Sequence, residues 1–115
     1  RLPDGFVEAY HHYVEQGWNA ISGPVAYGGQ GLPFTLACNV LENLGSANMA
    51  FTLLPILSVG AIEALDHHGS EGQKATYLPK LVSGEWSGTM NLTEPQAGSD
   101  GGALRTTATP IAEGE

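Results

Sequence analysis

The spacing of apolar residues predicts helices in the first part of the chain. Between Phe6 and Val14, apolar side chains recur at intervals that place them on one face of a helix, and Gly17 is a suitable end for it. A second apolar stripe predicts a helix over residues 34–44 that ends at Gly45.

An uncharged stretch, residues 47–62, predicts a third helical region that continues to about residue 67 and ends at Gly69. Pro55 is expected to break this region, because proline removes a hydrogen bond inside a helix. The uncharged stretch is shorter than the roughly 20 apolar residues that a membrane-spanning helix needs. A buried helix or helix pair is therefore favoured over a membrane span.

A fourth helix is predicted by the spacing of Ser70 and Gln73, which is that of a capping box. This helix is expected to end before Gly84 and to contain Pro79, a residue that can bend a helix.

Beyond Gly84 the pattern changes. Residues 87–92 alternate polar and apolar side chains and predict a strand, and residues 104–111 are rich in Thr and also β-like. We therefore expect a mainly α chain in two parts: an all-α domain over residues 1–84 and the beginning of a β-domain over residues 85–115.

Composition excludes some classes of partner. The 115 residues include 4 basic and 12 acidic side chains, for a net charge of −8. Nucleic acids and anionic membranes both attract clustered Lys and Arg, so neither is expected to bind.

The single cysteine, Cys38, cannot form a disulfide within the chain, which favours a reducing compartment such as the bacterial cytoplasm. Free cysteines are commonly buried, and Cys38 is expected to be so.

The richest candidate chemistry lies in residues 92–100, Leu-Thr-Glu-Pro-Gln-Ala-Gly-Ser-Asp. Thr93 and Ser99 carry hydroxyls that donate and accept hydrogen bonds, and Gly98 lets the backbone approach a ligand closely. Such a loop suits an anion or the polar edge of a heteroaromatic ring. For Glu94 and Asp100, hydrogen bonding to turn N–H groups and capping are favoured over acid–base chemistry.

Two further patterns carry weaker signals. The Gly-rich residues 23–31 lack the Lys-Ser/Thr ending of a P-loop, so a structural loop or one at the mouth of a substrate site is expected. The histidine pairs at residues 11–12 and 67–68 each point about 100° apart on a helix. Because no Cys or Asp stands at suitable spacing, no metal site is expected.

Two motifs in ordered succession resemble the signature of the acyl-CoA dehydrogenases. The first is Tyr-Leu-Pro-Lys-Leu-Val-Ser-Gly-Glu at residues 77–85, and the second is the sequence of residues 92–100. The Gly-rich residues 24–32 resemble a loop of the same family. That loop and Ala-Leu-Asp-His-His-Gly at residues 64–69 lean towards the large bacterial branch that includes 3-methylmercaptopropionyl-CoA dehydrogenases.

The resemblance implies a fold, a cofactor and a reaction. The chain would be the N-terminal helical domain and the first strands of the β-barrel-like middle domain of a protein several times longer. Family members use FAD to desaturate acyl-CoA thioesters, pass electrons to an electron-transfer flavoprotein and form homo-oligomers. Their catalytic base is a glutamate of the C-terminal helical domain, so no catalytic residue is expected in this chain.

The resemblance also assigns binding residues. Six positions are expected to contact FAD: Met90, Asn91, Leu92, Thr93, Gly98 and Ser99. The family often has an aromatic residue where Met90 stands, which argues against a stacking role there. Candidates for contact with the substrate are Ser99, near the CoA, and three residues along the acyl-chain tunnel: Thr52, Leu53 and Ile56. Core packing explains these three residues equally well.

Two alternatives stay open. A homologue with different flavin chemistry, such as an acyl-CoA oxidase or a nitroalkane oxidase, would carry the same motifs. The chain by itself could instead be a helical module without catalytic activity.

Overall fold

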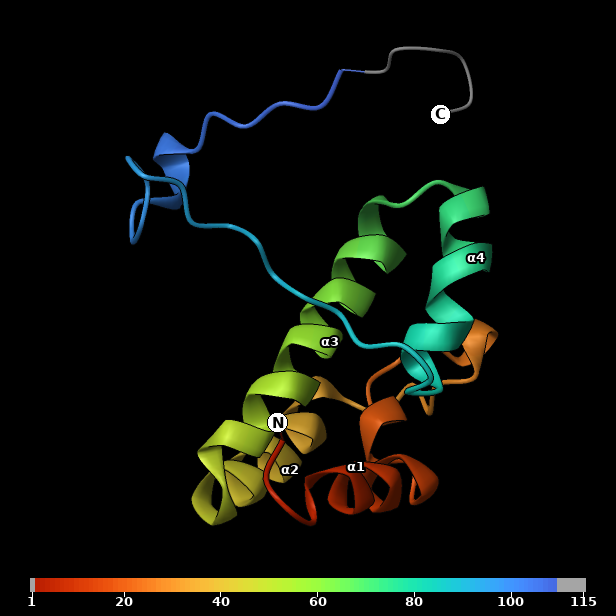
Figure 1. The fold of residues 1–115 in the computed structure, drawn as a ribbon. Helices are drawn as coiled ribbons and strands as arrows, with labels where there is room; N and C mark the ends of the chain where they lie inside the picture. Colours follow the sequence, from red (N-terminus) through yellow and green to blue (C-terminus); the bar gives the residue numbers. More distant parts are fainter. Residues whose placement is uncertain (1, 110–115) are drawn as a thin grey trace.

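The computed structural model describes residues 2–109, and this part of the chain is mainly helical (Figure 1). The four α-helices are α1 (Phe6–Glu15), α2 (Phe34–Ala47), α3 (Met49–His68) and α4 (Glu71–Val82). The single-turn 3₁₀ helices are η1 (Trp18–Ala20), η2 (Val25–Tyr27) and η3 (Gly101–Ala103). The predicted mainly α fold is confirmed.

The longest helix, α3, holds the others together. It packs against α2 on one side and α4 on the other. The core between α3, α4 and η1 consists of small and branched apolar residues: Ala20, Ile62, Leu78, Leu81 and Val82. A second contact joins α1 to α3, where the Phe51 ring lies 5.3 Å from Phe6 and 6.0 Å from Tyr13, measured between ring centroids.

Side-chain caps set two helix starts. The predicted capping box of α4 is confirmed: Ser70 N–H donates to Gln73 Oε1 at 2.9 Å, and Gln73 N–H donates to Ser70 Oγ at 3.3 Å. The start of α3 is marked by Asn48, whose Oδ1 accepts from Phe51 N–H at 3.1 Å. Asn48 has extended backbone, so α2 ends beside it at Ala47, and the expected end at Gly45 is wrong.

The expected break at Pro55 is also wrong, since α3 runs without interruption for 20 residues. Proline removes one hydrogen bond from a helix, and the buried contacts of Pro55 and its neighbours on α3 offset that loss. At this length α3 is long and apolar enough to cross a membrane, with a mean hydropathy of 1.6. That criterion is weak evidence for a span, because a core helix of a soluble protein meets it too.

No strand forms among residues 2–109, so the strand predicted over residues 87–92 is wrong for this chain. The same holds for the described residues 104–109 of the second β-like segment; residues 110 and 111 lie outside the described residues. A strand requires backbone groups of a neighbouring strand. The described residues offer only an isolated bridge between Glu94 and Ala97.

Cys38 is exposed rather than buried. Its neighbour Ala37 faces the interior and is 6% exposed. Successive residues on a helix are rotated by about 100°, so the inward position of Ala37 turns Cys38 outward.

The Gly-rich loop is a structural turn. Its backbone donors are used internally: Gln30 N–H donates to Ala20 O at 2.8 Å and Gly31 N–H donates to Gly23 O at 3.0 Å. A Cβ on Gly29 would lie 2.1 Å from the Gly23 backbone, so only glycine fits there. The structure therefore favours the structural interpretation over a loop at a substrate mouth.

Removing the centre of the core tests this packing. Leu78 is fully buried, and we expect Leu78→Ala to lower the free energy of unfolding by about 2–5 kcal/mol. Leu36→Ala on α2 is the matched control; Leu36 is 46% exposed, so its loss should cost less than about 1 kcal/mol. Urea unfolding followed by far-UV circular dichroism measures both. Equal destabilisation by the two variants would contradict this placement of the core.

Candidate functional site

The segment after α4 crosses α3 and then carries residues 92–104 away from the helices (Figure 1). It is fixed where it crosses. Gly88 N–H donates to Ser58 Oγ on α3 at 3.0 Å, and a Cβ at residue 88 would lie only 2.5 Å from the Ala61 Cβ. The absence of a side chain at Gly88 thus allows the segment to lie directly on the helix.

Glu94 closes the loop that follows. Its Oε1 accepts hydrogen bonds from Thr106 N–H at 2.8 Å and Thr106 Oγ1 at 2.5 Å. Its Oε2 accepts from Arg105 N–H at 3.0 Å and from Gln96 Nε2. The interpretation that Glu94 accepts N–H hydrogen bonds is confirmed, but most of the donors lie 11 and 12 residues further along the chain, not in its own turn.

These bonds favour the ionised carboxylate. Donation from the Thr106 hydroxyl, and then from the backbone of Thr106 and Arg105, lowers the pKa of Glu94 from 4.5 to about 2. A group with so low a pKa is a poor proton acceptor near neutral pH. Glu94 therefore has the electrostatics of a structural anion rather than of a general base.

The six residues predicted to contact the cofactor are all exposed: Met90, Asn91, Leu92, Thr93, Gly98 and Ser99. Within residues 2–109, none of them forms a hydrogen bond to another part of the protein. Open space surrounds the position that a Cβ would take on Gly98. The N–H groups and hydroxyls of these residues are therefore available to a ligand. Their chemistry fits FAD.

The three predicted acyl-tunnel residues do not share one environment. Thr52 is 6% exposed and its hydroxyl donates to Asn48 O at 3.1 Å. Thr52 and Ile56 line a hollow of about 460 Å³ between α2 and α3, together with Met49. Leu53 is 57% exposed and lies outside that hollow.

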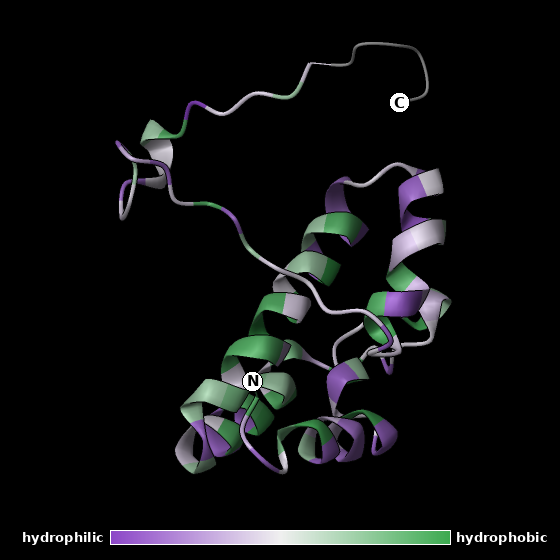
Figure 2. Ribbon diagram, viewed as in Figure 1, coloured by the Kyte–Doolittle hydropathy of each residue, from purple (hydrophilic) through white to green (hydrophobic). Residues whose placement is uncertain are grey.

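Apolar residues make up much of α3 (Figure 2), and several of them are exposed. Met49, Leu53 and Ile56 are 65%, 57% and 46% exposed. The loop that carries Ser99 lies apart from this part of α3 (Figure 1), so the structure does not bring Ser99 together with the other substrate candidates.

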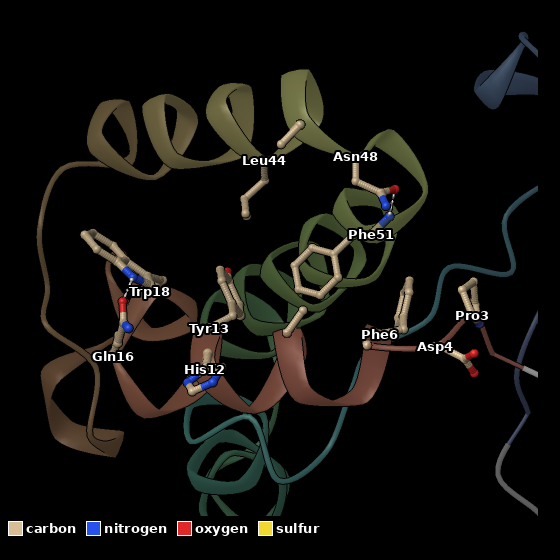
Figure 3. Close-up of a pocket in the computed structure, with 13 residues that line it drawn as sticks. Pro3, Asp4, Phe6, His12, Tyr13, Gln16, Trp18, Leu44, Asn48 and Phe51 are labelled. Carbon is tan, nitrogen blue, oxygen red and sulfur yellow. Dashed lines mark hydrogen bonds between the residues drawn. The ribbon is translucent and has the colours of Figure 1, made fainter.

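A second hollow, of about 430 Å³, lies between α1 and the junction of α2 and α3 (Figure 3). Aromatic and aliphatic residues form much of its wall (Phe6, Tyr13, Trp18, Leu44 and Phe51), and polar residues also line it, among them Asp4, His12, Gln16 and Asn48. Tyr13 is 7% exposed, and its hydroxyl has no hydrogen-bond partner within residues 2–109. Burial, and then the neighbouring Tyr10, raise the pKa of Tyr13 to about 12. No motif in the sequence marks this hollow, because residues from separate helices form it.

The histidines examined as possible metal ligands lie on the surface. His67 Nε2 is 3.4 Å from a carboxylate oxygen of Glu63, and His12 Nδ1 is 3.7 Å from one of Glu15. Within the described part of the chain, no three His, Cys, Asp or Glu side chains form a group that could hold a metal ion.

Comparison with known proteins identifies the family. The family model described as "Acyl-CoA dehydrogenase, N-terminal domain" matches residues 3–85. The chain belongs to the acyl-CoA dehydrogenase family, as its motifs predicted.

Three relatives show how the similarity is distributed. The chain is 51% identical over 98% of its length to 3-methylmercaptopropionyl-CoA dehydrogenase of Ruegeria pomeroyi, covering 19% of that protein. It is 36% identical over 94% of its length to a butyryl-CoA dehydrogenase of Syntrophomonas wolfei, covering 18% of it. It is 44% identical over 70% of its length to mitochondrial isovaleryl-CoA dehydrogenase of Pongo abelii, covering 19% of it.

The first of these similarities confirms the predicted likeness to the 3-methylmercaptopropionyl-CoA dehydrogenase branch. The chain spans about a fifth of the length of these curated relatives.

The state of Glu94 can be measured directly. We expect NMR titration of its carboxyl carbon to give a midpoint of about 2. Because the folded-state pKa is lowered, the stabilisation from this contact is fully present above about pH 4.5 and is lost as the pH falls towards 2. Thr106→Val, which removes one donor, should raise the midpoint. A wild-type midpoint near 4.5 would show that the hydrogen bonds are absent in solution.

Proposed function

We propose that this chain is the N-terminal helical domain and cofactor-contacting loop of an FAD-dependent acyl-CoA dehydrogenase that catalyses α,β-desaturation of acyl-CoA thioesters. Membership of the family supports the reaction class. The observation that carries the proposal is the exposed, uncommitted set of donors in residues 90–99, on a segment anchored by Gly88 at one end and by Glu94 further along.

Each loop residue has a separate proposed task. Thr93 would bond the polar edge of the flavin ring through its hydroxyl or N–H, together with the free backbone groups of residues 90–92. Gly98 would let the backbone approach the pyrophosphate, which Ser99 would also contact. Bound FAD would supply the hydride acceptor of the reaction.

The open apolar face of α3 supports a role in substrate binding. Leu53 and Ile56 expose apolar surface that an acyl chain or another part of the protein would cover. Thr52 would contribute its methyl group, because its hydroxyl is bonded to its own helix. Ser99 would contact the CoA portion of the substrate.

We propose that no residue of this chain is the catalytic base. Glu94, the acidic residue inside the loop, is occupied by its hydrogen bonds. The base would come from another part of the complete protein, so the chain alone would be inactive.

An electron-transfer flavoprotein is the proposed electron acceptor. The complete protein is proposed to be a homo-oligomer in the cytoplasm. An acyl-CoA oxidase is the second candidate. Comparing turnover with oxygen and turnover with an artificial electron acceptor would distinguish the two enzymes.

We also propose that the helical domain comprises residues 1–84 and that a second domain begins with residues 85–115. Two observations support this boundary. The last helix before the loop, α4, ends at Val82, and the matching family model ends at residue 85.

Thr93→Val in the complete gene product that carries this sequence tests the proposed cofactor contact. Losing one neutral hydrogen bond should weaken FAD binding by about 2- to 10-fold or slow flavin reduction by an acyl-CoA. Thr89→Val is the matched control, because Thr89 is exposed on the same segment but outside the predicted contacts. Flavin fluorescence titration and stopped-flow absorbance provide the readouts. Unchanged binding and reduction would refute the role of Thr93.

The 115-residue chain is expected to be catalytically inert. Purified chain mixed with FAD, an acyl-CoA and an artificial electron acceptor should give no desaturation, whereas the complete gene product should be yellow and bleached by its substrate. Turnover by the chain alone would place a base within it and contradict the proposal.

A further inference from the structure

We propose that Glu94 is a positioning residue for FAD: its carboxylate ties the loop of residues 92–99 to residues 105 and 106 and so holds Thr93 and Ser99 in place before the cofactor binds. This inference rests on the proposed function.

Within residues 2–109, the Glu94 carboxylate makes the only hydrogen bonds between residues 92–99 and residues 105–109. Of its protein partners, Thr106 and Arg105 lie on the far side of η3, while Gln96 lies in the loop itself. Within residues 2–109, no backbone hydrogen bond connects residues 92–99 to residues 105–109. Without Glu94, the two sides of the loop would have no direct polar connection in the described structure.

The turn inside the loop is already closed by backbone bonds. Glu94 N–H donates to Ala97 O at 3.1 Å, and Ala97 N–H donates to Glu94 O at 3.0 Å. Ala97 is 1% exposed, so this turn is packed as well as hydrogen-bonded. The turn has a fixed shape of its own, and the Glu94 carboxylate sets its position relative to residues 105 and 106.

The hydrogen bonds of Glu94 also restrict the position of Thr93, because Thr93 is the preceding residue. Fixing one residue restricts the backbone positions open to its direct neighbour. The Glu94 carboxylate is bonded to Thr106, and the Thr93 side chain beside it is exposed. Gly98 and Ser99 follow immediately after the closed turn, so their position depends on it too.

A carboxylate suits this task better than an amide. An ionised carboxylate only accepts hydrogen bonds and has two oxygens to do so, and here both oxygens face donors. Bonds to an ionised group are also stronger than those between neutral groups. Glu94→Gln would remove the charge and replace one acceptor oxygen with an NH₂ group that faces N–H donors, which weakens the connection while preserving side-chain size.

The test uses the complete gene product. Glu94→Gln should raise the dissociation constant for FAD by about 10- to 100-fold, the value expected for losing hydrogen bonds to a charged group. Thr106→Val, which leaves the carboxylate and the Thr106 N–H in place, should have a smaller effect in the same direction. Glu94→Asp keeps the charge and should restore part of the affinity. Glu85→Gln is the control, because Glu85 is an exposed carboxylate paired with Lys80 outside the loop.

A second readout does not depend on FAD. In the apoprotein, hydrogen exchange followed by mass spectrometry should show faster exchange of the Arg105 and Thr106 amides in Glu94→Gln, with unchanged exchange in α3 and α4. A loss of structure throughout the protein would instead accelerate exchange in those helices as well. If Glu94→Gln yields no folded protein, the FAD affinity and amide exchange of Thr106→Val decide the question.

The outcomes separate the two proposals. If the wild-type gene product takes up FAD and Glu94→Gln binds it with the same affinity, the positioning role is wrong and the proposed function stands. If the wild-type gene product takes up no FAD, both proposals are overturned. Weaker FAD binding together with faster exchange confined to the loop would support the positioning role.

Discussion

The packing of α3 against α2 and α4 positions every other segment of the described chain. Ile62 on α3 belongs to the same buried cluster as Leu78 and Val82 on α4, and burial of these side chains holds the two helices together. The departing segment then lies on α3 at Gly88, where a side chain would collide with Ala61. The position of the candidate loop therefore begins with the hydrophobic core and not with the loop's own residues.

Beyond Gly88, hydrogen bonds rather than apolar packing hold the chain in place. Residues 89–93 make no hydrogen bonds with the described protein and keep their donors and acceptors free. The next residue, Glu94, has its carboxylate fully engaged by residues 96, 105 and 106. A ligand that binds residues 89–93 does not have to displace existing protein hydrogen bonds, and the fixed neighbour at Glu94 limits how much of the loop must be ordered on binding.

Several features could be predicted from local sequence because local interactions decide them. The capping box at Ser70 and Gln73 involves residues of one turn, the existence of α1 follows from nearby apolar spacing, and the end of α3 follows from Gly69. The family motif likewise marks the loop by its residues alone. Three predictions were wrong: a helix break at Pro55, burial of Cys38 and a strand over residues 87–92. The first depends on packing around α3, the second on which face of α2 turns inward, and the third on a partner strand.

The helical class, the family and the residues of the loop could be predicted from the sequence, because periodicity, caps and motifs depend on residues that are close together in the chain. The tertiary structure alone decided that Glu94 reaches Arg105 and Thr106, that Gly88 lies against Ala61, and that Tyr13 faces a hollow between helices. Those contacts join residues 11 or more positions apart, or come from separate helices. Their geometry follows from how the helices pack, which no local pattern specifies.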